Sequence, residues 1–114
     1  MRPEVLRLLI GADPSHLTVA RAFVASSLRV LGYPEQLVDD LRLAVSELST
    51  LLVLSDQAPI VVELVIEASG TEISVSSNGQ IPSLAEDVKL LVGRLSGDGL
   101  TIEESRWVMT IPPP

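Results

Sequence analysis

The sequence predicts a single α+β domain, a two-layer α/β sandwich in which helices cover one face of a mostly antiparallel sheet. Apolar residues recur at intervals of three and four in three segments, which is the pattern of a helix with one buried face. In five shorter segments they alternate with polar residues or form a short run, as in strands. The expected order is strand, helix, helix, strand, strand, helix, strand, strand (βααββαββ), and strand pairs separated by helices favour an antiparallel sheet.

The composition limits the size and the partners of the protein. A chain of 114 residues fits one domain, residues 1–114, with one hydrophobic core. Fifteen acidic and eight basic residues give a net charge of -7, which opposes nucleic-acid binding. With no cysteine and one histidine, neither disulfides nor a zinc site is expected. No stretch reaches the roughly 18 apolar residues of a membrane span, so we expect no membrane contact and a cytoplasmic location.

The first predicted strand is followed by a helix with two apolar faces. Val5–Ile10 is a short apolar run ended by Gly11 and suits a strand. Asp13 and Pro14 predict the start of a helix, and Gly32 predicts its end. One stripe of this helix is predicted to lie in the core and consists of Leu17, Ala20, Val24, Leu28 and Leu31.

A second apolar stripe lies on another face of the same helix and is made of Val19, Phe23 and Val30. Two interpretations remain open for it. It packs against the margin of the sheet, or it binds a protein partner. His16, in the first turn of the helix, is expected to be solvated.

The second half of the chain is predicted to hold a long helix and two hairpins around a third helix. Pro34 opens the long helix, which runs to about Leu54. Its predicted buried stripe is Leu37, Leu41, Ala44, Leu48 and Leu52. Strands are expected at residues 60–68 and 72–76, and Asn78-Gly79 ends the second of them as a turn. Ser83 is predicted to cap a helix to about Leu95 with an apolar stripe of Leu84, Val88, Leu91 and Leu95. A closing hairpin is expected at residues 100–103 and 107–111, with Trp107 in the core.

Residues 40–50, Asp-Leu-Arg-Leu-Ala-Val-Ser-Glu-Leu-Ser-Thr, resemble the first nucleotide-site motif of bacterial anti-sigma factors with serine-kinase activity, a branch of the histidine-kinase-like ATPase superfamily. The resemblance implies a Bergerat-like fold, ATP and magnesium as cofactors, Glu47 as the base, and a magnesium-holding asparagine four residues later. Leu51 stands at that asparagine position. Because magnesium needs oxygen ligands and leucine has none, metal-assisted phosphoryl transfer should fail.

Two further features of the family are altered. The resemblance expects an adenine-binding aspartate where Ser77 stands, followed by spaced glycines, of which Gly79 after Asn78 is present and the second is absent. A neutral hydroxyl lacks the charge-assisted component that strengthens such a hydrogen bond. The flexible lid over the phosphates is expected to be deleted, because the sequence passes from Pro82 directly into the third predicted helix.

The sequence therefore favours a regulatory protein-binding domain that resembles an anti-sigma factor, needs no cofactor and has no kinase activity. The vestigial site positions are Glu47, Leu51, Ser77, Asn78 and Gly79. The partners that the resemblance implies at Val19, Phe23 and Val30 are a sigma factor, an anti-anti-sigma protein or a second copy. One alternative is an ATP-dependent serine-protein kinase that acts on an anti-anti-sigma partner and uses Glu47 with replacement ligands. Another is a generic dimerisation or scaffold module, in which Glu47 is an ordinary helix acid.

Overall fold

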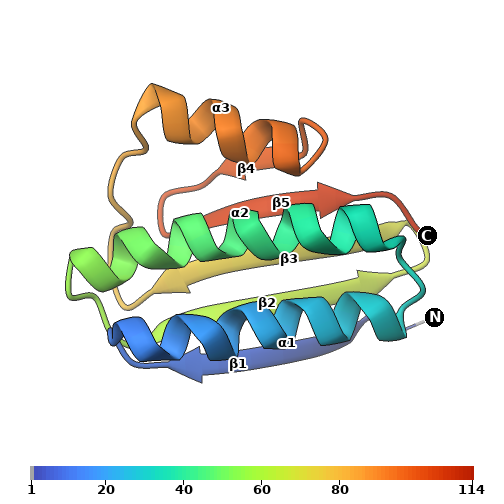
Figure 1. Ribbon diagram of the computed structural model, residues 1–114, viewed down its shortest axis with the longest axis horizontal. Coiled ribbons are helices and arrows are strands. Elements are labelled where there is room, and N and C mark those ends of the chain that lie inside the picture. The colour runs from blue at the N-terminus through green and yellow to red at the C-terminus, as the bar shows by residue number, and fades with distance from the viewer. Residues whose placement is uncertain (1) are drawn as a thin grey trace.

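The computed structural model describes residues 2–114 and has two layers, a sheet and a layer of helices (Figure 1). The elements of residues 2–114 are β1 (Glu4–Ile10), the 3₁₀ turn η1 (Pro14–His16), α1 (Leu17–Val30), α2 (Glu35–Leu54), β2 (Ile60–Glu67), β3 (Gly70–Ser77), α3 (Glu86–Leu95), β4 (Leu100–Ile102) and β5 (Arg106–Ile111). The predicted α+β class is confirmed.

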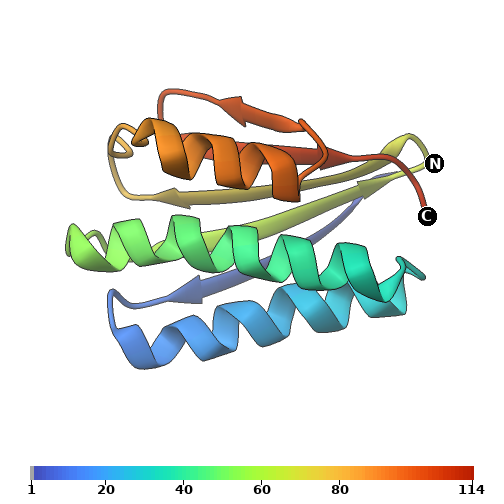
Figure 2. The ribbon, with the colours of Figure 1, turned by 45° about the horizontal axis from the view of Figure 1, so that its top comes forward.

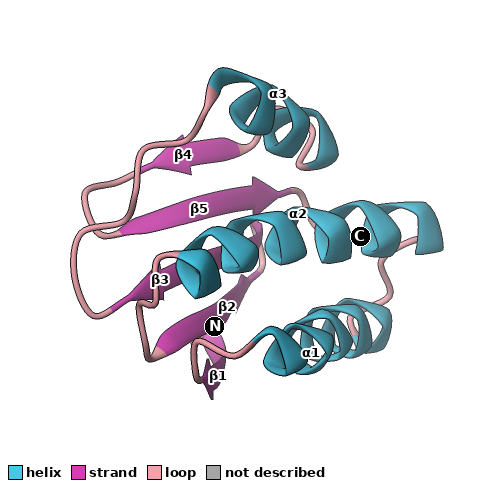
Figure 3. Cartoon of the chain, turned by 60° about the vertical axis from the view of Figure 1, so that its left-hand side comes forward, coloured by secondary structure: helices cyan, strands magenta, loops and turns pink. Residues whose placement is uncertain are grey.

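The strands described in residues 2–114 form one five-stranded sheet in the order β1-β2-β3-β5-β4. Every pair of neighbouring strands is antiparallel. The helices all lie on one face of this sheet and leave the other face uncovered (Figures 2 and 3). β1 and β4 are the two edges, and β1 is more than twice as long as β4.

The core lies between the helices and the inner face of the sheet. The predicted stripe of α2 is buried there, because residues spaced by three and four share one side of a helix. The members of that stripe with no exposed surface are Leu41, Ala44, Leu48 and Leu52. They face inward-pointing strand residues, of which Val62, Leu64, Ile73 and Val75 are fully buried. Trp107 pairs with Val75 across β5 and β3 and is also fully buried, as predicted.

A buried tyrosine holds the α1–α2 connection to the far end of the sheet. The hydroxyl of Tyr33 lies 3.0 Å from the hydroxyl of Thr71 and donates to the carbonyl oxygen of Pro112 at 2.9 Å. Thr71 lies opposite Ile111 in the β3–β5 pair. This bond network therefore joins the helix layer, the β2–β3 hairpin and the end of β5.

The predicted start of the third helix at Ser83 is wrong. α3 begins at Glu86, after Ala85, whose backbone is extended. Leu84 lies in the segment before the helix and packs against the core, so the chain stays extended there. The fully buried residue of α3 is Val92, whereas Leu91, which the predicted stripe contained, is exposed.

The backbone conformation at two glycines can be tested by replacing each of them with alanine. Gly70, at the start of β3, has a φ of +138°, and a Cβ there would meet the carbonyl oxygen of Ile111. We expect Gly70→Ala to lower the free energy of unfolding by at least about 2 kcal/mol. Gly93, inside α3, has open space around it, so Gly93→Ala should raise that free energy by about 0.5–1 kcal/mol. Urea unfolding of both variants measures this, and midpoint shifts of the same sign would contradict the backbone described here.

Candidate functional site

The predicted nucleotide-site residues come from two elements that meet at one end of the molecule. Glu47 and Leu51 lie four residues apart on α2, and Ser77 is the last residue of β3. The hydroxyl of Ser77 donates to the side-chain oxygen of Gln57, in the loop after α2, at 2.7 Å. The structure thus brings the end of β3 against the end of α2, and the Ser77 hydroxyl is already engaged there.

Asn78 and Gly79 lie just beyond β3 and are exposed. They belong to the irregular segment that leads from β3 to α3. No side-chain hydrogen bond of Asn78 is found within residues 2–114, which fits its interpretation as part of a strand-ending turn.

Apolar side chains gather beside α2 in this part of the molecule. Leu51 is half-buried and packs against the core. Ile81 and Leu84, from the segment before α3, and Val88, from α3 itself, pack against the same core. α3 in turn lies against α2 (Figure 2). Leu51 therefore contributes to packing in the structure, at the position where the resemblance expects a metal ligand.

Glu47 is half-buried on α2. It forms no ion pair and no side-chain hydrogen bond with any residue of the range 2–114. No three His, Asp or Glu side chains in the described part of the chain come close enough together to hold a metal ion. A lone carboxylate can accept a proton, but phosphoryl transfer also needs groups that neutralise the charge of the phosphates.

A second candidate surface runs along the β1 side of the molecule, where α1 lies beside β1 (Figure 1). We call it the β1/α1 edge, and it consists of β1 together with the side of α1 that carries Val19, Ala22, Phe23, Ser26 and Val30. Val19 is 48% exposed and Val30 is 87% exposed, whereas Phe23 is half-buried against the core. Phe23 therefore contributes to the core, Val30 stands largely in solvent, and Val19 lies half exposed beside the end of β1.

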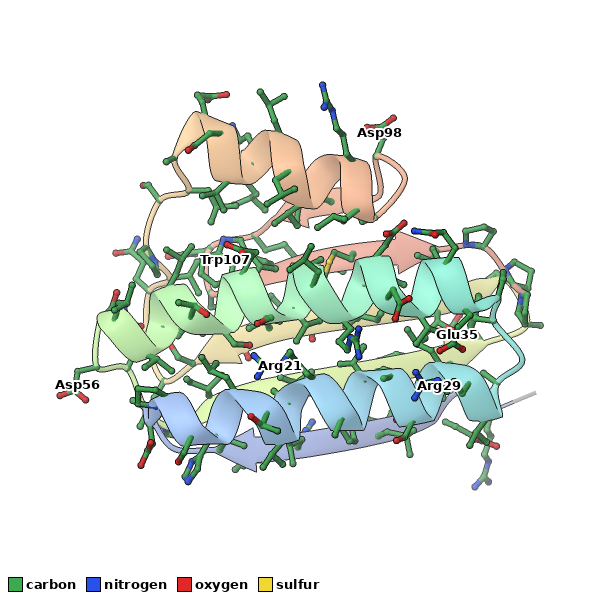
Figure 4. All side chains as sticks on the ribbon, viewed as in Figure 1. Arg21, Arg29, Glu35, Asp56, Asp98 and Trp107 are labelled. Atoms are coloured by element: carbon green, nitrogen blue, oxygen red, sulfur yellow. The ribbon has the colours of Figure 1, made fainter. Side chains whose placement is uncertain are left out.

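The charged residues of α1 all turn away from this edge (Figure 4). They are two arginines, Arg21 and Arg29. Arg21 donates to the hydroxyl of Ser46 on α2 at 3.0 Å. Arg29 donates to Glu35, at the start of α2, at 2.6 and 2.9 Å, and this bonding lowers the pKa of the Glu35 carboxyl. The opposite side of α1 is left without a charge.

A hollow of about 530 Å³ opens on the β1/α1 edge, where β1 ends and α1 begins. Its mainly apolar lining includes Leu8, Leu9, Ile10, His16, Val19 and Pro59. The prediction that His16 is solvated is wrong: the ring is half-buried, and its Nδ1 accepts a hydrogen bond from the Gly11 amide at 3.1 Å. This bond requires an unprotonated Nδ1 and leaves Nε2 as the donor of the ring.

Asp13, a charged residue, lies directly before the turn η1 in the same region. Its carboxylate accepts hydrogen bonds from the Ser15 amide at 2.9 Å and from the Ser15 hydroxyl at 2.8 Å. These bonds lower the pKa of the Asp13 carboxyl. Asp13 is the predicted helix cap, but it caps the turn η1, and α1 itself begins only at Leu17.

Sequence reasoning identified the apolar stripe on α1 but missed the contribution of β1 to the same surface. An apolar run such as Val5–Ile10 does not indicate whether the strand lies in the middle of a sheet or at its edge. Two signals were present in the sequence: the run carries Arg7, and it precedes every other strand in the chain. Neither is specific enough to predict an edge strand.

No model of a known protein family matches the chain, and no curated protein matches it either. The likeness to anti-sigma factors therefore depends on residues 40–50 of α2. None of the helices described in residues 2–114 combines the length and the apolar character needed to cross a bilayer.

The packing role of Leu51 can be tested against a nearby leucine. Leu51→Asn restores the side chain that the resemblance expects but places an amide against apolar neighbours, so we expect a loss of about 1–3 kcal/mol in the free energy of unfolding. Leu54, on the same helix, is 78% exposed, and Leu54→Asn should change that free energy by less than about 0.5 kcal/mol. Equal losses in the two variants, measured by urea unfolding, would show that Leu51 is not a packing residue.

Proposed function

We propose that this protein is a regulatory protein-binding domain of the anti-sigma type, with a Bergerat-like fold whose lid is deleted and whose nucleotide site no longer acts. The observation that carries the proposal is that Leu51, at the position where the resemblance expects a magnesium ligand, packs against the hydrophobic core. A phosphate group beside this side chain would lose its hydration without gaining a cation or a hydrogen-bond donor from it.

The state of Ser77 supports the same proposal. Its hydroxyl donates to Gln57, so recognition of an adenine amino group would have to compete with a bond formed within the protein. With a leucine at the magnesium position, a serine at the adenine position and no lid, each of the three parts of an ATP site is weakened.

Binding to a protein is supported by the β1/α1 edge, to which α1 contributes no charged residue. Exposed large apolar side chains on a surface with no charged residue of α1 favour a protein partner over water. A sigma factor or an anti-anti-sigma protein is the partner that the resemblance implies, and a cytoplasmic location goes with it.

The alternative is an ATP-dependent serine-protein kinase. It is favoured by one observation: Glu47 is retained on α2, is half-buried and is not neutralised by an ion pair within residues 2–114. In this alternative Glu47 accepts the proton of a serine on the anti-anti-sigma partner, and other groups of the protein or its partner replace the magnesium ligand.

Calorimetric titration with ATP and magnesium separates the two functions. For the binding domain we expect no saturable heat up to about 1 mM nucleotide, because a dissociation constant above that range corresponds to less than about 4 kcal/mol of binding free energy. Leu51→Asn serves as the matched variant and should bind no better, since Ser77 and the missing lid are unchanged. Micromolar binding by the wild-type protein, with phosphate transfer lost in Glu47→Gln, would establish the kinase instead.

The partner can be tested directly. The purified protein, immobilised, is offered the sigma factors and anti-anti-sigma proteins of its own organism one at a time. We expect saturable binding of one of them in the absence of nucleotide. Binding that appears only with ATP and magnesium would contradict the proposal that the nucleotide site is inactive.

A further inference from the structure

We propose that the hollow where β1 ends and α1 begins is a binding site for a small neutral molecule that carries a carbonyl group. The Nε2–H group of His16 is the donor to that carbonyl oxygen. The inference goes beyond the proposed function and is independent of it, because none of the five vestigial nucleotide-site positions lines the hollow.

Three segments that are far apart in the sequence form the walls of the hollow (Figure 1). They are residues 8–11 at the end of β1, His16 and Val19 at the start of the helix layer, and residues 58–59 before β2. Ile10 pairs with Ile60, the first residue of β2, and both side chains are buried in the core. The sheet therefore fixes the β1 and β2 walls relative to each other, and small-molecule sites are usually pre-formed in this way.

The size and the lining of the hollow suit a small molecule. Its volume of about 530 Å³ falls within the roughly 300–1,000 Å³ that is typical of such sites. Small-molecule sites are mainly apolar and contain a few placed polar groups. In this hollow the side chains of the lining are apolar except for that of His16. The ligand therefore has an apolar body and one polar group, which lies at the histidine.

The hydrogen bond from Gly11 determines which nitrogen of His16 is free. Nδ1 accepts the Gly11 amide at 3.1 Å, so the proton of the neutral ring is on Nε2. Nε2 forms no hydrogen bond with any residue of the range 2–114. In this range, the fully enclosed side-chain polar atoms that lack a partner belong to Ser49 and Trp107, so Nε2 is accessible. His16 thus offers one N–H donor to a molecule in the hollow.

Charge favours a neutral ligand. No side chain of the lining is ionisable apart from His16, and the bond from Gly11 requires an uncharged ring. An anion would lose its hydration beside apolar side chains and gain only one neutral donor. Asp13, whose carbonyl oxygen accepts the His16 amide at 2.9 Å, also opposes an anion. Its carboxylate is ionised, since the bonds from Ser15 lower the pKa of the carboxyl.

The single donor favours a carbonyl group over other neutral groups. A hydrocarbon would cover the Nε2–H group without pairing it, and an unpaired buried donor is costly. A hydroxyl would bring a second donor, for which the lining side chains provide no acceptor besides the Nδ1 that Gly11 already occupies. A ketone, ester or tertiary amide accepts the bond and brings no donor of its own.

NMR titration with benzylacetone tests the site, because this ketone joins an apolar phenylethyl group to one carbonyl group. We expect saturable shifts at the backbone amides of Gly11, His16 and Val19, with a dissociation constant on the order of 1 mM. Hydrocinnamate, which has a carboxylate in place of the acetyl group, should bind at least about 10-fold more weakly. Equal or tighter binding of hydrocinnamate would overturn the neutral class of ligand, and unshifted amides at these three residues would overturn the site.

The donor can be observed directly, because the chain has a single histidine. Two-bond ¹H–¹⁵N spectra of the free protein should show His16 with a proton on Nε2 and none on Nδ1. Benzylacetone should shift the Nε2 resonance more than the Nδ1 resonance, because the carbonyl oxygen bonds Nε2–H alone. A proton on Nδ1, or a larger shift of Nδ1, would contradict this donor.

Two variants test the location of the ligand. Val19 lines the hollow and is 48% exposed, so Val19→Asp places a carboxylate at the wall and should weaken benzylacetone binding at least about 10-fold. The matched control is Leu90→Asp, because Leu90 is 61% exposed and lies on α3. Its dissociation constant should stay within about two-fold of the wild-type value. Dispersed amide spectra establish that both variants are folded, and equal losses of binding in the two would overturn the location.

Discussion

The packing of α2 against the middle of the sheet is the interaction on which the rest of the structure depends. Leu41, Leu48 and Leu52 are fully buried between the two layers. Burial of each such side chain is worth about 1.5–3 kcal/mol. With α2 over the central strands, α1 and α3 are left to cover the sheet on either side of it (Figure 3). The same helix carries the motif that resembles a nucleotide site, so the core and the candidate site share one element.

This shared element ties the candidate site to the stability of the fold. Leu51 stands where the resemblance expects an asparagine, and it is half-buried and packs against the hydrophobic core. An asparagine there would place an amide against apolar neighbours, and the cost of burying it opposes a polar ligand at this position.

The two flanks of α2 differ in what they leave exposed. On one flank α3 lies beside the short edge strand β4. On the other flank α1 and the long edge strand β1 present a surface without a charge from the helix.

The sequence by itself determined the α+β class, the buried stripe of α2, the burial of Trp107 and the placement of Glu47 and Leu51 on one side of a helix, because helix and strand periodicities are local properties. Only the tertiary structure decided that α3 begins at Glu86, since Leu84 is held by the core. It also decided that His16 accepts a bond from Gly11 and that Ser77 donates to Gln57. The position of β1 at the sheet edge was likewise decided only by the tertiary structure. Strand order depends on contacts between distant segments, and the periodicity of the sequence does not indicate which segments come into contact.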